Sequence, residues 1–390
     1  MPSARRNIFA SLSVFLALGA AFPPACAQDA APLPTLNSLI PQDLRQDLDA
    51  HFWGWASYLA TTNEDDHSYW DGELSLDVTK TYANRVAATV QMNFIDANDQ
   101  MRGELEQAFV SVLLSEQGGT IFTAGKFNAN FGVEARDFWN RYTGTTSLLF
   151  AAQPQDLIGL MLTQPVGDTG LKVRGFLTNG FQGRFDFDQV PSGGITIEYR
   201  PHHDLRLALT NWVGPGFVKP YEEDEEEQEE EYEYGTYAEY GSSEYGEYGE
   251  YAYGRPAFAN WQGPRFDAET GGTLYFLDAK AIWTPRADLT LAAEYLLGIT
   301  SSSEGQFTWT GFMLLANYDI TDRWRVFGRW SYLDDTDGVV TGTAQRLHEL
   351  SAGLAYTLVR NVELRGEYRH DFSDKNDETD SVSVHLSFGL

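Results

Sequence analysis

Cysteine is almost absent from this 390-residue sequence: the single one is Cys26, which excludes an intrachain disulfide and any site built from several thiolates. Positive charge is also scarce. The 27 Lys and Arg residues face 56 Asp and Glu residues, giving a formal net charge of −29, which argues against nucleic-acid binding because phosphates need a basic face. After the first 22 residues there is no apolar run of the ~20 residues that a membrane helix needs. Aromatic and β-branched residues are too abundant for a disordered chain.

The N-terminus has the pattern of a secretory signal. Two arginines precede an apolar stretch at 8–21, and Ala25-Cys26-Ala27 has the small-x-small spacing of a cleavage site. We therefore predict a signal peptide over 1–27 and a periplasmic N-terminal segment over 28–48. Cleavage removes the only cysteine and changes the net charge from −29 to −31. A lipoprotein acylated at Cys26 is the weaker alternative, because the residues before it lack the usual apolar side chain.

Beyond the signal, short segments alternate apolar and polar residues with the period of two that is typical of half-buried strands. At the C-terminus, Val382, Val384 and Leu386 interleave with serines and a histidine. A soluble β-sandwich alternates in the same way over five or six residues. Here the segments run for about ten, which matches the ~9–11 residues of a tilted strand that crosses a bilayer.

The alternation predicts an all-β transmembrane antiparallel barrel over 49–390 with about 16 strands, an even number as in single-chain bacterial barrels. Fourteen or eighteen strands stay open as alternatives. The predicted strands are 50–60, 70–80, 86–96, 103–114, 119–126, 156–165, 170–180, 193–200, 203–213, 272–284, 287–299, 307–319, 322–334, 346–358, 361–372 and 380–390.

The connections between these segments differ in length on the two sides. Every other connection is short, and the intervening ones are longer and polar: 61–69, 97–102, 127–155, 181–192, 214–271, 300–306, 335–345 and 373–379. Short periplasmic turns and long extracellular loops are typical of an outer-membrane barrel. Aromatic residues such as Trp53, Trp55, Trp324 and Trp330 are predicted to form girdles at the membrane interfaces.

Apolar faces that meet lipid leave the polar faces to line the lumen. Counting the phase of each strand places these charged residues inward: Asp71, Glu73, Asp77, Lys172, Arg174, Arg206, Arg323, Arg325, Arg329, Glu363, Arg365, Glu367 and Arg369. Ionised groups in a dry core cost several kcal/mol unless they are paired. The interior is therefore either a hydrated channel, which we favour, or a network of mutually paired charges.

One stretch carries a family resemblance. Gly125-Lys126-Phe127 ends a strand, Phe131-Gly132-Val133-Glu134 forms a turn, and Asn140, Ser147, Phe150, Pro154 and Gly159 follow at characteristic spacings. Over 120–165 the sequence resembles the OmpL-like β-barrel porin family, and elsewhere the similarity lies in the strand rhythm. It departs from barrel proteins in its last residue, which is Leu390 rather than Phe. The resemblance implies a porin in which the connection 127–155 folds into the lumen and narrows it.

The predicted constriction carries five charged residues: Lys126, Glu134, Arg136, Asp137 and Arg141. Acids that face a wall of arginines would create a transverse field that orients dipolar solutes. Alternatively, Glu134 and Arg136, or Asp137 and Arg141, pair within the loop and pin it to the wall. The two readings are compatible.

The connection 214–271 is an acidic insertion rich in Tyr, Gly and Glu, which the family resemblance does not explain. Nine of the ten residues at 222–231 are acidic, and 222–250 contains 14 acids without a Lys or Arg. Mutual repulsion and the glycine content favour a disordered, solvated extracellular flap. Weak capture of divalent cations is the alternative, although no spaced metal-binding loop is present.

The sequence predicts no enzyme, cofactor or metal site. Its seven histidines are scattered and match no metalloprotease, esterase or phosphate-loop pattern; His385, between Ser383 and Ser387, is the one candidate for hydrolysis. A plugged receptor of about 22 strands would not fit the length. We predict an outer-membrane porin for small hydrophilic solutes or ions, in contact with lipid and, by analogy with porins, a homotrimer. The rival is a non-conducting surface or adhesion protein that binds partners or cations through its loops.

Overall fold

The computed structural model describes residues 48–61, 68–97, 100–129, 131–134, 141–180, 191–215, 217–218, 266–267, 272–302, 305–375 and 378–389. The predicted signal peptide 1–27, the segment 28–47 and the acidic run 222–253 lie outside these residues. No helix in the described part of the chain is both long enough and apolar enough to cross a membrane.

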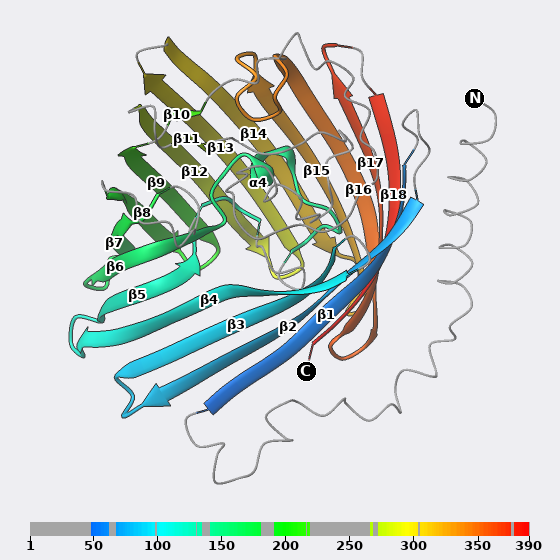
Figure 1. Cartoon of the computed structure of the whole chain (residues 1–390). Helices are drawn as coiled ribbons and strands as arrows, with labels where there is room; N and C mark the ends of the chain where they lie inside the picture. Colours follow the sequence, from blue (N-terminus) through cyan, green and yellow to red (C-terminus); the bar gives the residue numbers. More distant parts are fainter. Residues whose placement is uncertain are drawn as a thin grey trace, which may run out of the picture.

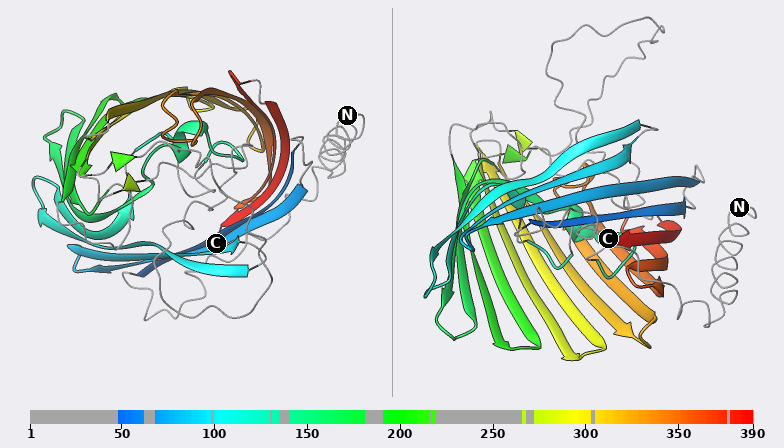
Figure 2. Two further views of the ribbon diagram at one scale, coloured as in Figure 1. Left: turned by 45° about the horizontal axis from the view of Figure 1, so that its top comes forward. Right: turned by 90° about the horizontal axis from the view of Figure 1, so that it is seen from below.

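Sixteen antiparallel strands close into one barrel (Figures 1 and 2). The ring closes because β1 pairs with both β2 and β18, with Trp53 opposite Ser75 on one side and Gly389 on the other. The barrel strands are β1 (Leu48–Thr61), β2 (Ser68–Tyr82), β3 (Val86–Ala97), β4 (Gln100–Ser115), β5 (Thr120–Asn128), β6 (Asp156–Val166), β7 (Leu171–Thr178), β8 (Ser192–His202), β9 (Leu205–Pro215), β12 (Thr273–Arg286), β13 (Leu289–Ser302), β14 (Gly305–Asp319), β15 (Trp324–Asp335), β16 (Gln345–Val359), β17 (Val362–Ser373) and β18 (Glu378–Gly389).

The predicted fold and strand number are confirmed, and the strand ends move by a few residues. One element was not predicted: the short pair β10 (Phe217–Val218) and β11 (Phe266–Asp267), which lies within the connection 214–271. A short helix, α4 (Leu148–Ala151), lies in the connection between β5 and β6.

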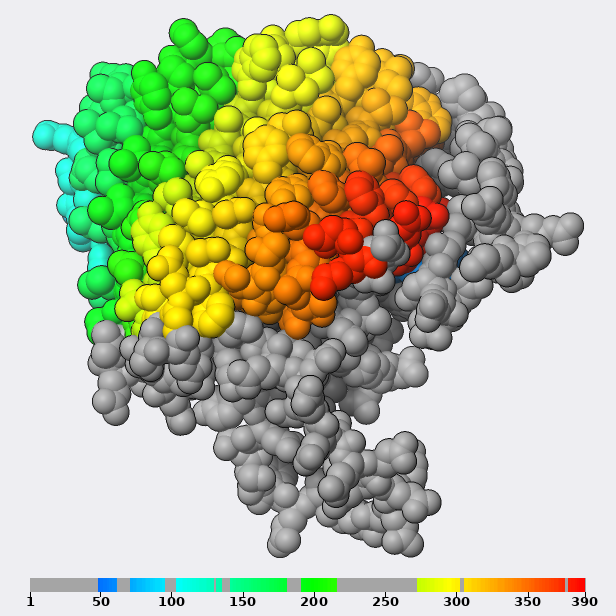
Figure 3. Space-filling model, turned by 90° about the horizontal axis from the view of Figure 1, so that it is seen from above, coloured from blue at the N-terminus to red at the C-terminus, as the bar shows by residue number. Residues whose placement is uncertain are grey.

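The burial pattern is the reverse of that in a soluble protein. On β9, Leu207, Leu209 and Val213 are 38–46% exposed, whereas Thr210 and Trp212 between them are fully buried. The same holds around the wall, and Figure 3 shows the strands from β9 (green) to β18 (red) as one continuous outer surface. Exposing a large aliphatic side chain to water costs roughly 1.5–3 kcal/mol relative to burying it. An outer surface of this kind therefore requires a lipid environment.

Short turns gather at one end of the barrel. β2 and β3 are joined through Ala83 and Asn84, whose φ angles of 49° and 55° fit a tight hairpin turn. The other turns at this end are 116–119, 167–170, 203–204, 287–288, 320–323 and 360–361. At the opposite end, the predicted long connections 97–102 and 300–306 are wrong. There β3 is only two residues from β4 and β13 only two residues from β14, because strand pairing continues to Ala97–Gln100 and Ser302–Gly305.

Two residues of the predicted aromatic girdles face the other way. Trp53 and Trp55 are 9% and 6% exposed, and the indole Nε1 of Trp55 donates to the Glu73 carboxylate, 3.4 Å away. Both rings therefore point into the lumen. The alternation of β1 explains this, because Trp55 pairs directly with inward-facing Glu73.

Candidate functional site

The connection between β5 and β6 enters the barrel. Figures 1 and 2 show α4 inside the ring of strands, and its residues contact β14, β15 and β16. The helix begins at Ser147, whose hydroxyl accepts from the amide of Phe150 at 3.2 Å and so caps the first turn. We call the described residues of this connection, 129, 131–134 and 141–155, the inner loop.

The inner loop is anchored at its base by a buried ion pair. Gly125 has a φ of 131°, and a Cβ there would lie 2.2 Å from the carbonyl oxygen of Ala108, so only glycine fits. Beside it, the Lys126 ammonium donates to the carbonyl of Leu105 at 2.9 Å and pairs with Asp156 at 2.7 Å. The strand end and the strand start that flank the loop are thereby tied together.

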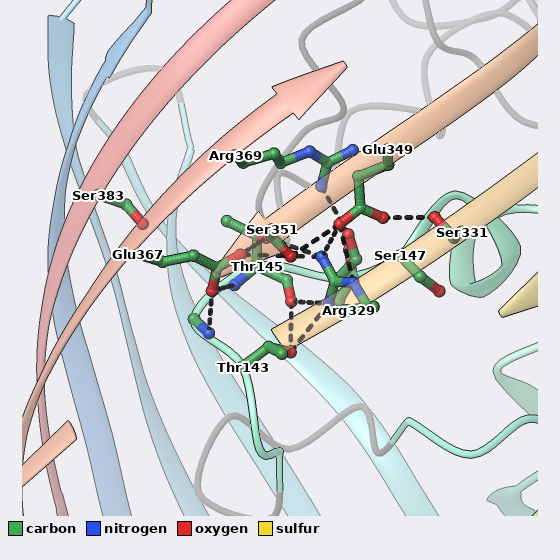
Figure 4. Close-up of polar contacts among 12 residues, drawn as sticks. Thr143, Thr145, Ser147, Arg329, Ser331, Glu349, Ser351, Glu367, Arg369 and Ser383 are labelled. Carbon is green, nitrogen blue, oxygen red and sulfur yellow. Dashed lines mark hydrogen bonds and ion pairs between the residues drawn. The ribbon is translucent and has the colours of Figure 1, made fainter. Parts of the chain in front are cut away.

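Arg329 on β15 fastens the inner loop to the wall. Its guanidinium is fully buried and pairs with Glu349 of β16 at 2.6 Å and with Glu134 of the loop at 2.7 Å. Figure 4 shows it between Glu349 and the loop threonines. It donates to the Thr143 hydroxyl at 2.9 Å and to the carbonyl of Thr145 at 2.6 Å. One side chain thus joins two strands and two parts of the loop.

Glu349 and Glu134 are held by further donors. Glu349 accepts from the hydroxyls of Ser331 at 2.5 Å and Ser351 at 2.9 Å, and Glu134 accepts from the amide of Ser147 at 2.8 Å. Charged hydrogen bonds of this kind contribute more than neutral ones. Each of these two buried carboxylates therefore has Arg329 and at least one further donor, as a buried charge requires.

Three consecutive inward positions of β17 bind the backbone of the inner loop. Arg365 donates to the carbonyl of Thr143 at 2.5 Å, and Arg369 donates to the carbonyl of Thr146 at 2.6 Å. Between them, Glu367 accepts from the amides of Gly144 at 2.5 Å and Thr145 at 3.1 Å, and from the Thr145 hydroxyl. The wall therefore binds main-chain groups of the loop, so the loop needs no charged side chains at 143–146.

The other side of the inner loop is apolar. Leu148 and Leu149 of α4 are fully buried against inward side chains of the wall, in a cluster with Phe131, Trp309 and Met313. Nearby, Glu294 accepts from the amide of Val133 at 2.6 Å, and Lys280 donates to the carbonyl of Gly132. The loop is therefore a fixed part of the interior along the whole of its described length.

A separate polar cluster covers the wall formed by β2, β3 and β4. Glu73 and Glu106 are 2% and 0% exposed, respectively. Glu106 accepts from Gln91 at 3.0 Å and from Asn93, and Asn93 accepts from Ser75 at 2.6 Å. This wall presents carboxylates and amides, whereas β15 and β17 present guanidinium groups.

A third group of charges surrounds one carboxylate on β8. Glu198 pairs with Lys172, Arg174, Arg200 and Arg206 at distances of 3.8, 3.3, 3.1 and 2.9 Å. These residues lie close to the turns 167–170 and 203–204, at the short-turn end of the barrel. We call Glu198 and its four cationic partners the Glu198 cluster.

The structure places most of the predicted lumen residues on the inner face of a strand. These are Asp71, Glu73, Asp77, Lys172, Arg174, Arg206, Arg325, Arg329, Glu363, Arg365, Glu367 and Arg369. The placement of Arg323 on a strand is wrong: β15 begins at Trp324, because the Thr321 hydroxyl accepts from the amides of Arg323 and Trp324 and closes a turn before the strand.

Among the predicted constriction residues, Lys126 lies at the base of the inner loop, Glu134 binds Arg329 and Arg141 is 3% exposed. Arg136 and Asp137 lie outside the described residues. Glu349, Glu106 and Glu198 were not predicted. The alternation of β16 and β8 gives Glu349 and Glu198 an inward phase, whereas Glu106 lies at a register shift between β3 and β4, where the alternation is interrupted. Thr143 and Thr145 were not predicted as site residues either, because they carry no charge that would have indicated a role in the lumen.

His385 does not stand in an accessible catalytic arrangement. Its Nε2 lies 2.8 Å from the Ser383 hydroxyl, and the residue is 4% exposed beneath Gly144 of the inner loop. Within the described ranges, no group of three or more His, Cys, Asp or Glu side chains could hold a metal ion.

Known porin structures share this architecture. The outer-membrane channel DcaP of Acinetobacter baumannii is 9% identical with a TM-score of 0.57, and the match covers 88% of this chain and 97% of that one. An anion-selective porin from Comamonas acidovorans is 10% identical with a TM-score of 0.56, covering 88% and 100%. The trimer form of OmpT from Vibrio cholerae is 11% identical with a TM-score of 0.53, covering 88% and 99%. At these identities the likeness shows the fold alone.

The family is shown by the sequence rather than by the fold. No curated protein matches this sequence. The family model described as "Putative beta-barrel porin-2, OmpL-like" matches residues 78–388, from the middle of β2 to the end of β18. This match includes the inner loop and all the walls that hold it. The chain therefore belongs to the OmpL-like family of β-barrel porins of the bacterial outer membrane, whose fold is that of a passive diffusion channel.

Proposed function

We propose that the inner loop forms the narrowest section of the path that small hydrophilic solutes or ions take through this porin. The main observation behind this proposal is that Arg329 attaches the loop firmly to the wall. A loop held by Arg329 and by three positions of β17 keeps one position across the lumen, so it defines a stable aperture. A mobile loop would instead give a fluctuating one.

The charges around this aperture set its ion preference. Lys126, Glu134, Arg136, Asp137 and Arg141 are the proposed constriction residues, and the lumen wall adds guanidinium groups on β15 and β17 and carboxylates on β2. Because Arg329 and Arg369 are largely neutralised by Glu134, Glu349 and Asp371, we expect little net selectivity at the aperture. The acidic insertion outside would add a preference for cations at low ionic strength, where its field is less screened.

Export, assembly and the absence of catalysis complete the proposal. The N-terminal pattern at 1–27 supports export by a cleaved signal peptide, and the mature chain would reside in the outer membrane without enzymatic activity. One structural neighbour is described in a trimer form. We propose a homotrimer for this chain as well, which cross-linking of the protein in native outer membranes would test.

Chemical modification of the inner loop tests the position of the aperture. Tyr142 is partly exposed between the buried Arg141 and Thr143. In the mature chain, which keeps no native cysteine after cleavage at 27, we expect a charged methanethiosulfonate reagent to change the single-channel conductance of Tyr142→Cys. The matched control, Leu209→Cys, lies on the lipid-facing side of β9 and should show no change. Equal responses of the two variants would refute the proposed path.

A further inference from the structure

The Glu198 cluster differs from the other buried ion pairs in its charge balance. Four cations surround one carboxylate, so the cluster carries a formal charge of +3. In the described part of the chain, no other carboxylate lies within ion-pair distance of these four cations. At the inner loop the balance is reversed, because three carboxylates surround Arg329.

The cluster also has hydrogen-bond donors to spare. Both Glu198 oxygens are already shared, one between Lys172 and Arg200 and the other between Arg174 and Arg206. Within the described residues, the buried Nη1 of Arg174 and Nε of Arg206 donate to no acceptor. A buried charged donor without a partner is costly, so these positions favour an additional acceptor.

Water reaches the cluster from the short-turn end. The Glu198 side chain is 2% exposed, whereas those of Lys172, Arg206 and Arg200 are 34%, 35% and 55% exposed. The Arg174 side chain is 12% exposed. Glu198 and Arg174 therefore form the floor of the cluster, and Lys172, Arg200 and Arg206 form its accessible face. An anion that approaches from this end meets several cationic groups before it meets the acid.

We propose that the Glu198 cluster is a binding station for multivalent oxyanions, such as phosphates and dicarboxylates, at the short-turn mouth of the pore. The oxygens of the solute would bind the exposed parts of Lys172, Arg200 and Arg206 and share Lys172 with Glu198. A change of side-chain rotamer would bring the buried free donors of Arg174 and Arg206 to the same oxygens. Arginine suits this task, because its planar donors match phosphate and carboxylate oxygens. Glu198 holds the four cations together in the absence of solute and weakens the station enough for release.

Within the described residues, no hydrogen bond or ion pair joins the station to the inner loop, and the station gives the two ends of the barrel charge of opposite sign. The connection 214–271, which joins β9 and β12 at the end with the long connections, contains 14 acids at 222–250. At the other end, the cluster carries a surplus of positive charge. The inference rests on the proposed pore only for the passage of the solute. Binding itself is a property of the folded barrel and can be measured without current.

The test uses inorganic phosphate and succinate as probes at constant ionic strength, with chloride as the background anion. Binding is followed by the shift of the thermal unfolding midpoint of the purified barrel, and passage by the reduction of chloride current in planar bilayers, with the probe added to each side in turn. We expect both probes to stabilise the protein. We also expect them to reduce the chloride current more strongly when they are added on the side of the short turns.

Three variants make the test specific. Arg174→Gln and Arg206→Gln should each weaken the apparent phosphate affinity by about tenfold, because each removes a charged hydrogen bond. Glu198→Gln should strengthen it, because the competing carboxylate becomes neutral. Arg286→Gln, which removes a positive charge at the same end but outside the lumen, is the matched control and should leave the affinity unchanged.

The outcomes separate this inference from the proposed function. Stabilisation by phosphate that depends on Arg174 and Arg206, without any current, would support the station and refute the pore. Normal current with no effect of phosphate, or with equal affinity in the wild type, Arg206→Gln and Arg286→Gln, would overturn the station. A fall in affinity in Glu198→Gln, with normal heat-modifiable migration, would overturn the role given to the carboxylate.

Discussion

Replacing Arg329 with methionine should release the inner loop from the wall. The change removes a guanidinium that contacts Glu134 and Glu349 together, at 2.7 and 2.6 Å, and it leaves both carboxylates buried. It also removes donors to Thr143 and Thr145. The remaining contacts of the loop, through β17 and α4, stay in place.

The magnitude follows from the burial of this group. Breaking a buried ion pair by removing one partner costs about 3–5 kcal/mol, because an uncompensated charge stays behind. At about 1.4 kcal/mol per factor of ten, the equilibrium between attached and detached loop should shift by roughly 10²- to 10⁴-fold towards detachment. We expect an aperture that fluctuates between conductance levels.

Single-channel recording of Arg329→Met in planar bilayers measures this shift as added open-channel noise and sub-states. Neutralising the two acids nearest to Arg329 in Arg329→Met/Glu134→Gln/Glu349→Gln should restore part of the quiet conductance, since Glu367 is then the one carboxylate of the three that keeps its charge. Heat-modifiable migration establishes that each variant forms a barrel. If Arg329→Met conducts with wild-type noise and wild-type thermal stability, the loop is not held in the way described here.

Three further changes have defined outcomes. Glu367→Gln keeps one acceptor oxygen for Thr145 and should lower the free energy of unfolding by about 1–3 kcal/mol, as thermal unfolding would show. Gly144→Ala would place a Cβ 2.5 Å from Nε2 of His385, so overpacking should cost about 1–3 kcal/mol and alter conductance; unchanged values would contradict the close approach. Deleting 222–253 should reduce the cation preference at about 0.01 M salt, where the Debye length is about 30 Å, and leave conductance near 1 M unchanged. Equal reversal potentials at every salt concentration would remove any electrostatic role for the insertion.

The strands could be predicted because each one is a local pattern. An alternation with a period of two indicates which side chains face lipid. It placed twelve charged residues correctly on the inner wall. It failed for Arg323, because the hydroxyl of Thr321 ends the turn two residues later than the pattern suggests. It failed for the girdle residues Trp53 and Trp55, because aromatic content alone does not give the phase of a strand.

The contacts of the inner loop could not be predicted, because they are made between residues distant in the sequence. Arg329 lies 195 positions from Glu134, and Glu367 lies 222 positions from Thr145. Glu367 binds backbone amides, which every sequence offers equally. The Glu198 cluster is an intermediate case: the phase of β8 places Glu198 inward, but only the pairing of β7, β8 and β9 brings four cations to it.

The central claim is that this barrel conducts through an aperture fixed by the inner loop. Single-channel conductance of the purified protein in planar bilayers tests it most directly. We predict discrete, stable steps of uniform size, with conductance that rises in proportion to salt concentration. A protein that shows heat-modifiable migration and β-type circular dichroism but produces no steps at any salt concentration would contradict the claim.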